Sequence, residues 1–232
     1  MEGSAAFSLL EFFKLGGIFM WPLLVFSVAA AGLVIDRVFF FFRHNLRIDL
    51  LYPQVLEHIN GGNLGEAAEM LEPLTTRGMG ARVLFCLVKH ADLNEERLEK
   101  AVETEALSCI NEMETGFNFL TAIGSLAPLT GFLGTVSGMI GAFRSIAEAT
   151  EVNAQIVANG IYEALITTVF GLIIAIIAMS AHYILSSMAD RFAVRSEKVC
   201  SELITALAKR SGIHSKTRGT KALRGPAKKN AD

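Results

Sequence analysis

Few side chains in the apolar parts of this chain could take part in acid–base or proton-transfer chemistry. Glu163 stands at the beginning of one long apolar stretch, and Asp36 stands beside Arg37 at the end of another. Thr135 and Thr168 add hydroxyl groups, which can orient water but do not titrate near neutral pH. Charges inside a membrane are costly and therefore functional, so a proton carrier would be a carboxylate deep in such a stretch. The chain has none at that depth, and we expect Asp36 and Arg37 to form a local ion pair.

Small residues recur at steps of three or four in two of these stretches, which places them on one helix face. The two sets are Gly124, Ala127, Gly131, Gly134, Gly138, Gly141 and Ser145, and Gly160, Ala164, Thr168, Gly171, Ala175, Ala178 and His182. Such a face lets a neighbouring helix backbone approach closely, and Gly134 and Gly138 form a GxxxG motif in it. A threonine here can line a pore or simply bond to its own i−4 carbonyl. The spacing leaves both roles open.

Three segments are long and apolar enough to cross a bilayer, which takes about 20 largely uncharged residues. They are residues 15–35, 116–143 and 164–188. The last contains only His182 as a possible charge. A cleaved signal peptide is the alternative for the first, but the residues before it are more acidic than basic, and its apolar run continues past the alanines at 29–31. The sequence therefore predicts three transmembrane helices, with a kink at Pro128 in the second.

Basic residues are distributed unevenly around the three segments. Residues 43–115 carry seven, residues after 188 carry eleven, and residues 145–163 carry none. Because basic loops stay in the cytoplasm, we expect the N-terminus and the short link to be periplasmic and the C-terminus to be cytoplasmic. Cys86, Cys109 and Cys200 then lie on or near the reducing side and have no CxxC pair, which favours free thiols.

The whole plan predicted from the sequence has eight parts. They are an interfacial amphipathic segment (1–14), a first transmembrane helix (15–42), a cytoplasmic helical domain (43–115), a second transmembrane helix (116–144), a periplasmic link (145–163), a third transmembrane helix (164–188), a cytoplasmic helix (189–210) and a disordered basic tail (211–232). Residues 80–115 have few helix breakers and predict one helix that runs straight into the second span. Contact with anionic lipid is the alternative to a solvated tail.

The composition excludes several classes of protein. The 21 basic and 23 acidic residues give a net charge of −2, without the basic excess of a nucleic-acid-binding protein. A hydrophobic content of 52% excludes a disordered chain. The sequence holds no nucleotide-binding loop, metal cluster or nucleophile–base pattern, so we expect neither enzymatic activity nor a cofactor.

Two long motifs resemble signatures of the MotA/TolQ/ExbB proton channel family. The segment APLTGFLGTVSGM at 127–139 is similar to its APxxGLxGTVxGM signature, and GIYEALITTVFGL at 160–172 is similar to its GIxEALxxTxxGL signature. Met20, Trp21 and Pro22 at the first span, the three-span plan and the long cytoplasmic segment extend the likeness over most of residues 10–210. Within the family, the chain resembles ExbB and TolQ.

The resemblance implies a homo-pentameric bundle in the bacterial inner membrane. Two copies of a single-span partner of the ExbD or TolR type would sit in the pore and supply the missing carboxylate. A periplasm-spanning protein of the TonB or TolA type would pass on the energy of proton flow. By matching positions, the pore and proton pathway would include Thr135, Thr167, Thr168 and Glu163, the last near the outer mouth. Gly131, Gly134, Gly138 and Gly171 would pack the helices.

Three departures accompany the resemblance. Ile177 stands where the family commonly has proline, so a kink in the third span is not implied, and Arg144 stands where an apolar residue is usual. The N-terminus is shorter than in some ExbB proteins. The sequence favours an ExbB-like subunit, and it leaves two alternatives open. These are a TolQ-like subunit serving outer-membrane integrity and division, or another stator role, and a non-conducting membrane scaffold.

Overall fold

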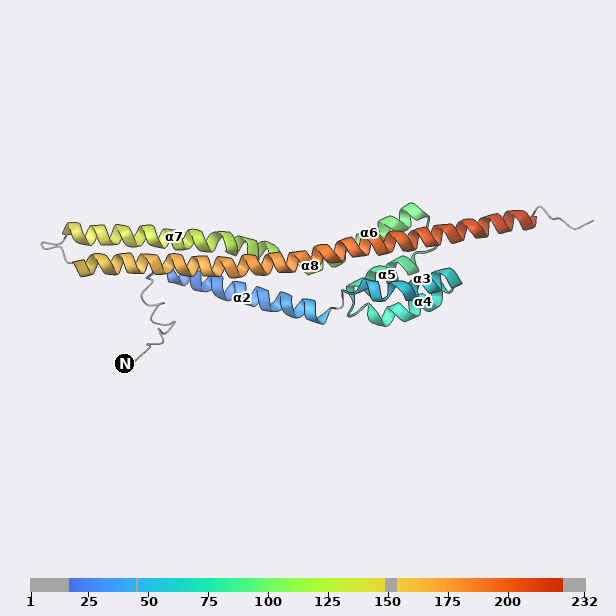
Figure 1. The fold of residues 1–232 in the computed structure, drawn as a ribbon, viewed down its shortest axis with the longest axis horizontal. Helices are drawn as coiled ribbons and strands as arrows, with labels where there is room; N and C mark the ends of the chain where they lie inside the picture. The colour runs from blue at the N-terminus through green and yellow to red at the C-terminus, as the bar shows by residue number, and fades with distance from the viewer. Residues whose placement is uncertain (1–16, 45, 149–153, 223–232) are drawn as a thin grey trace, which may run out of the picture. The chain divides into compact units, whose positions relative to one another are not determined.

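The computed structural model describes residues 17–44, 46–148 and 154–222, and their regular structure is almost entirely helical. The helices are α2 (Met20–Arg43), η1 (Ile48–Leu50), α3 (Tyr52–Gly61), α4 (Leu64–Leu71), η2 (Glu72–Leu74), α5 (Met79–Lys89), α6 (Glu95–Glu114), α7 (Phe117–Glu148) and α8 (Ala154–Ala222) (Figure 1). Three helical stretches are long and apolar enough to cross a membrane, namely Met20–Arg43, Glu95–Glu148 and Gly160–Arg210. The prediction of an all-α chain with three such helices is confirmed.

The chain forms two compact units. Unit 1 comprises Met1–Phe39 and Thr115–Ser187, and unit 2 comprises Phe40–Glu114 and Met188–Asp232. The long helices α2 and α8 each contribute to both.

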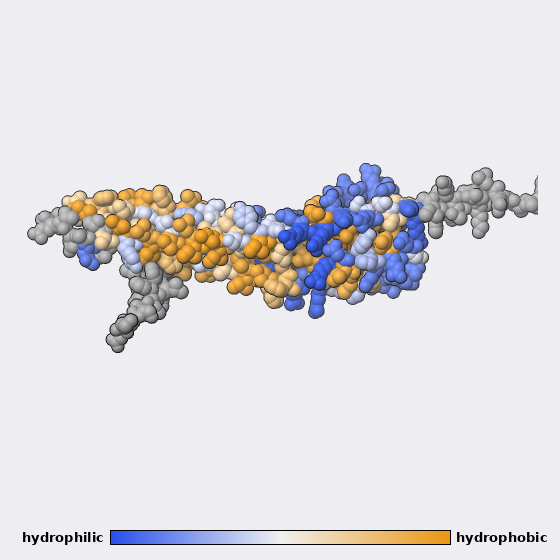
Figure 2. All heavy atoms as spheres, in the orientation of Figure 1, coloured by the Kyte–Doolittle hydropathy of each residue, from blue (hydrophilic) through white to orange (hydrophobic). Residues whose placement is uncertain are grey.

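Unit 1 buries many small side chains and exposes many large apolar ones. Ala127, Ala164 and Ala178 are almost fully buried, whereas Phe132 and Ile176 are more than 60% exposed. Figure 2 shows apolar residues covering the surface of these helices. Helices that associate in lipid have this pattern, because small residues give close backbone contact and large apolar residues face the acyl chains.

Two helices of unit 1, α2 and α7, begin after glycines with positive φ. Gly17 (φ 64°) precedes α2 and Gly116 (φ 84°) precedes α7. This left-handed conformation is open to glycine at no steric cost and is disfavoured for other residues. The predicted continuous helix from residue 80 into the second span is therefore wrong. It is broken at Gly116, and again between α5 and α6, where the Asn94 side chain accepts a bond from the Arg97 amide (3.2 Å) and caps α6.

Unit 2 has a conventional apolar core with polar ties between its helices. Fully buried side chains include Ile48, Val55, Ile59, Leu71, Met79, Leu84, Leu87, Met113 and Leu203. Arg82 on α5 pairs with Glu105 (2.9 Å) and Glu112 (2.8 Å) on α6. Arg210 on α8 donates to the Ile59 carbonyl at the end of α3 (2.7 Å). The part of α8 beyond Ser187 is thus an integral part of this unit.

The ends of the predicted segments differ from the helix bounds in several places. Helix α7 continues to Glu148 and α8 begins at Ala154, so both enter the predicted link at 145–163. Helix α8 continues to Ala222, whereas the sequence places the start of a disordered tail at residue 211. The interfacial segment expected at 1–14, residues 149–153 of the link and residues 223–232 of the tail lie outside the described residues.

Candidate proton pathway in unit 1

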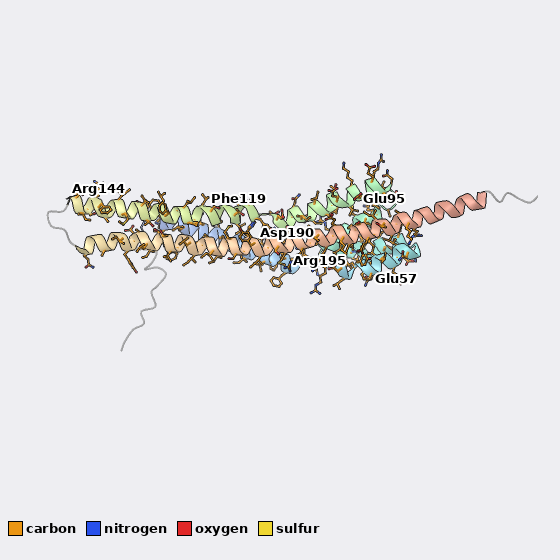
Figure 3. The ribbon with its side chains drawn as sticks, turned by 45° about the horizontal axis from the view of Figure 1, so that its top comes forward. Glu57, Glu95, Phe119, Arg144, Asp190 and Arg195 are labelled. Atoms are coloured by element: carbon orange, nitrogen blue, oxygen red, sulfur yellow. The ribbon has the colours of Figure 1, made fainter. Side chains whose placement is uncertain are left out.

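Glycines bring the backbones of α7 and α8 into direct contact. A Cβ on Gly131 would lie 2.8 Å from the Thr167 carbonyl oxygen, and one on Gly171 would lie 2.5 Å from the Ala127 carbonyl oxygen. Both neighbours are backbone atoms, which cannot move aside cheaply. Figure 3 shows the two helices side by side over this length. Only glycine fits at these two positions.

The other two packing glycines expected from the sequence lie in the same contact. A Cβ on Gly138 would lie 3.0 Å from the Ala164 Cβ, and one on Gly134 would overlap the side chain of Thr167. From Gly131 to Gly138, this face of α7 thus contacts Ala164, Thr167 and the backbone of α8. This part of the stripe of small residues therefore faces the partner helix inside one chain.

Three threonine hydroxyls gather where the glycines hold the helices together. Thr135 on α7 and Thr168 on α8 are hydrogen-bonded to each other. The Thr135 hydroxyl also lies 3.1 Å from the Ala164 carbonyl oxygen, and the Thr168 hydroxyl lies 3.1 Å from the Gly131 carbonyl oxygen. These hydrogen bonds cross between the two helices. The two threonines therefore do more than bond to the i−4 carbonyl of their own helix.

Thr167 belongs to the same cluster but has a different environment. Its side chain is buried, and its hydroxyl lies 2.8 Å from the Ala164 carbonyl oxygen and 3.3 Å from that of Gly131. Thr135 and Thr168 remain partly exposed. Of the three, only Thr135 and Thr168 can present a hydroxyl to water or to another chain in this structure.

Glu163 lines a groove at one end of unit 1. The groove has a volume of about 340 Å³ and is lined by Ile18, Phe19, Gly134, Ser137, Gly138, Gly141, Ala142, Ser145, Gly160 and Glu163. It extends along α7 from Ser145 to Gly134, the residue before Thr135. Glu163 and Thr168 are five residues apart on α8, or about 7.5 Å along its axis. The groove therefore connects the carboxylate to the neighbourhood of the threonine cluster.

Gly17 is a contact of Glu163 that was not predicted from the sequence. A Cβ at this position would overlap the Glu163 carboxylate. The available signal was a glycine near the beginning of the first apolar segment, and glycine is also common in ordinary turns. The first part of unit 1 thus helps to fix the carboxylate in the groove.

We predict that Gly17→Ala will lower stability and displace Glu163. The positive φ alone costs about 1–2 kcal/mol for alanine, and the added methyl group meets the carboxylate. Gly32→Ala is the matched control, because Gly32 lies inside α2 and a methyl group added there would have no atom within 4 Å. Thermal unfolding in detergent should show a lower midpoint for Gly17→Ala and an equal or higher one for Gly32→Ala. Equal midpoints for both variants would contradict the contact.

Asp36 and Arg37 form the ion pair expected from the sequence, with a separation of 2.6 Å. In the described parts of the chain, no three His, Cys, Asp or Glu side chains are grouped so that they could hold a metal ion. All three cysteines are free thiols.

The thiol of Cys86 in unit 2 is shielded from solution chemistry. Burial, with the nearby Glu105 carboxylate, raises its pKa above the ordinary value of 9.0, against a smaller opposing effect of Lys89. A raised pKa lowers the thiolate fraction at neutral pH, and the thiolate is the reactive form. We predict that maleimide labelling of Cys86 at pH 7 is slower than that of an exposed Ser108→Cys thiol, and rises with pH beyond pH 9. Equal rates at pH 7 would contradict this.

Comparison with known proteins shows similarity to one family of membrane proteins. Residues 66–198 match the profile of the MotA/TolQ/ExbB proton channel family. The chain is 34% identical over 188 residues to the putative biopolymer transport protein ExbB-like 1 of Synechocystis sp., covering 78% of this chain and 71% of that protein. It is 28% identical over 188 residues to biopolymer transport protein exbB1 of Vibrio cholerae, covering 78% and 80%.

A TolQ protein is also among the relatives. The chain is 37% identical over 94 residues to the Tol-Pal system protein TolQ of Pseudomonas aeruginosa, covering 40% of this chain and 38% of that protein. The residues matched by the family profile include the glycine contact, the threonine cluster and Glu163. This chain belongs to the MotA/TolQ/ExbB proton channel family.

Proposed function

We propose that this chain is an ExbB-like subunit of an inner-membrane motor driven by the proton motive force. Five copies form a helical bundle, and a single-span partner of the ExbD or TolR type sits in its pore. A TonB- or TolA-like protein carries the stored energy across the periplasm to the outer membrane. The observation that carries the proposal is the threonine cluster between two glycine-packed helices that lack a carboxylate at mid-membrane.

The chemistry of the cluster supports a pathway in which this chain orients water and the partner supplies the carboxylate. Threonine hydroxyls donate and accept hydrogen bonds, so Thr135 and Thr168 can hold water in line for proton transfer, but they cannot carry the proton themselves. A carboxylate on a second chain completes the path. Each proton that crosses 100 mV releases about 2.3 kcal/mol. This energy is available for work only if protons cannot leak through the bundle without the partner.

A TolQ-like role is the second candidate, and the local 37% identity to a TolQ protein favours it. The two roles differ in what fails when the gene is deleted in its host. Loss of energised uptake across the outer membrane with an intact cell envelope supports the ExbB-like role. Envelope leakage and division defects with normal uptake support the TolQ-like role and overturn the first proposal.

The topology that goes with this function is an N-terminus in the periplasm and a C-terminus in the cytoplasm. Single cysteines at Ser4 and Asn153 in a cysteine-free background should react with a membrane-impermeant maleimide in whole cells. Ser108→Cys, which places an exposed thiol in unit 2, should react only after lysis. Labelling of Ser108→Cys but not of Asn153→Cys in whole cells would reverse the orientation.

We predict that Glu163 has both a structural and a proton-handling role at the outer mouth. Glu163→Gln keeps the shape of the side chain in the groove but removes its titration, so it should preserve assembly and reduce proton flux. Glu163→Ala should also weaken assembly. Glu148→Gln is the matched control, because Glu148 is an exposed carboxylate on α7, paired with Arg144 outside the groove. Full flux in Glu163→Gln, with lost assembly in Glu163→Ala, would exclude a proton-handling role.

A further inference from the structure

His182 on α8 carries a buried polar atom that the threonine pathway does not use. Its Nδ1 is buried and has no hydrogen-bond partner among the described residues. The ring lies edge-on to Phe117 of α7, with centroids 5.7 Å apart, and tilted to Tyr183 (5.6 Å). Buried polar atoms in native proteins are nearly always satisfied, by protein or by ordered water, so an orphaned one calls for an explanation. Neither aromatic ring satisfies a ring nitrogen in its plane.

His182 and Glu163 bracket the apolar part of α8. They are 19 residues apart, which is about 28 Å along a helix axis, and the hydrocarbon core of a bilayer is about 30 Å thick. Each has an exposed tyrosine next to it, Tyr162 at one end and Tyr183 at the other. Tyrosines concentrate at the two membrane–water interfaces. The carboxyl group and the imidazole of this part of α8 thus lie at opposite ends of a length that matches the hydrocarbon core.

His182 also lies on the helix face that carries Thr168. The two are 14 residues apart, close to four full turns, and the residues between them on this face are small. These are Gly171, Ala175 and Ala178, and all are buried. A proton that has passed the threonine cluster therefore meets no other titratable side chain of α8 before it reaches His182.

Few charged residues lie near His182 along the described helices. On α2, Asp36 and Arg37 are already paired with each other. Along the chain, the next charged residues are Glu114, before Phe117, and Asp190, two turns beyond His182. Phe117 itself, the residue of α7 in contact with the ring, is uncharged. Among the described residues of α7 and α8 in unit 1, the imidazole is therefore the acid–base side chain at this end, and no ion pair must break for it to exchange a proton.

We propose that His182 is the proton-exchange group at the cytoplasmic end of the pathway. The neutral imidazole takes a proton from the pathway water at its unprotonated ring nitrogen and releases one proton to water on the cytoplasmic side, so that it returns to its starting state. The free Nδ1 marks the place where that water binds. This inference rests on the proposed function, because it gives His182 a task only if protons cross the bundle.

The test measures proton flux in liposomes that contain the chain with its single-span partner, as the pH on the His182 side is varied from 5.5 to 8. Wild-type flux should change with this pH and show a midpoint within the range. His182→Gln, which cannot titrate, should reduce flux roughly tenfold or more and remove this midpoint. Tyr183→Phe, which alters the neighbouring ring but not the imidazole, should keep both flux and midpoint.

His182→Phe separates proton exchange from packing, because it keeps a ring against Phe117 and removes both nitrogens. Wild-type flux and an unchanged midpoint in either His182 variant would overturn the inference. Absence of flux in the wild-type complex would instead overturn the proposed function, so the two failures are distinguishable. If both variants fail to assemble, the titration of the His182 ring is measured by ¹⁵N-histidine NMR in a chain whose other four histidines are replaced by glutamine. A His182 ring that does not titrate between pH 5 and 8 would overturn the proposal.

Discussion

Alanine at Gly131 or Gly171 is expected to weaken the pairing of α7 and α8 strongly. The new methyl group would lie 2.8 Å from a carbonyl oxygen in the first case and 2.5 Å in the second, and both oxygens belong to the backbone of the partner helix. The helices must therefore separate. Overpacking of this kind costs about 1–3 kcal/mol, and the separation also lengthens the hydrogen bonds of the threonine cluster.

Gly141→Ala is the matched control for these two variants. Gly141 lies on the same helix, α7, and a methyl group added there would have no atom within 4 Å. Alanine there should be neutral or should stabilise the helix by up to about 1 kcal/mol. Thermal unfolding in detergent should give lower midpoints for Gly131→Ala and Gly171→Ala than for Gly141→Ala. Three equal midpoints would show that the helices are not in backbone contact.

Valine at Thr135 or Thr168 is expected to reduce proton flux and leave the oligomer intact. Valine has nearly the shape of threonine but lacks the hydroxyl that links the two helices and orients water. Loss of one such hydrogen bond is worth about 1 kcal/mol, and about 1.4 kcal/mol in a barrier is a tenfold change in rate. We therefore expect roughly a fivefold reduction for each variant and a larger one for the double variant, measured as dye-reported proton flux.

Thr130→Val is the control for the loss of a hydroxyl from the same helix. Thr130 bonds to the Leu126 carbonyl of its own helix (2.9 Å), one and a half turns before Thr135. Its replacement should leave flux unchanged. Unchanged flux in the double Thr135→Val/Thr168→Val variant would remove the threonines from the pathway and favour a non-conducting scaffold.

Much of the helical plan could be predicted from the sequence, because the length of each apolar stretch and the spacing of the small residues are local properties. The breaks around α6 were missed because Glu, Leu and Ala dominate that region and favour a continuous helix. The signals were nevertheless present. Asn94 followed by two glutamates is typical of a helix start, and Gly116 provides the left-handed residue at the next boundary.

The contacts of the site depend on how α7 and α8 are aligned with each other. The spacing of residues within one helix does not determine this alignment. The resemblance places Thr135 and Thr168 in one pore, but only the structure shows that they are hydrogen-bonded to each other. The different burial of Thr167 and Thr168 also depends on where α7 lies against α8. Adjacent residues on a helix point about 100° apart, so one is buried against α7 and the other is partly exposed. The contact of Gly17 with Glu163 joins distant parts of the chain, and a glycine near the start of an apolar segment does not identify its partner.

We propose that this chain forms a proton-tight bundle whose conduction depends on a carboxylate from a single-span partner. The most direct test compares proton flux in liposomes that hold the chain alone, the chain with its partner, and the chain with a partner whose intramembrane aspartate is replaced by asparagine. The expected result is flux above the lipid background only in the second case. Large proton flux from the chain alone, or undiminished flux with the asparagine partner, would contradict the claim.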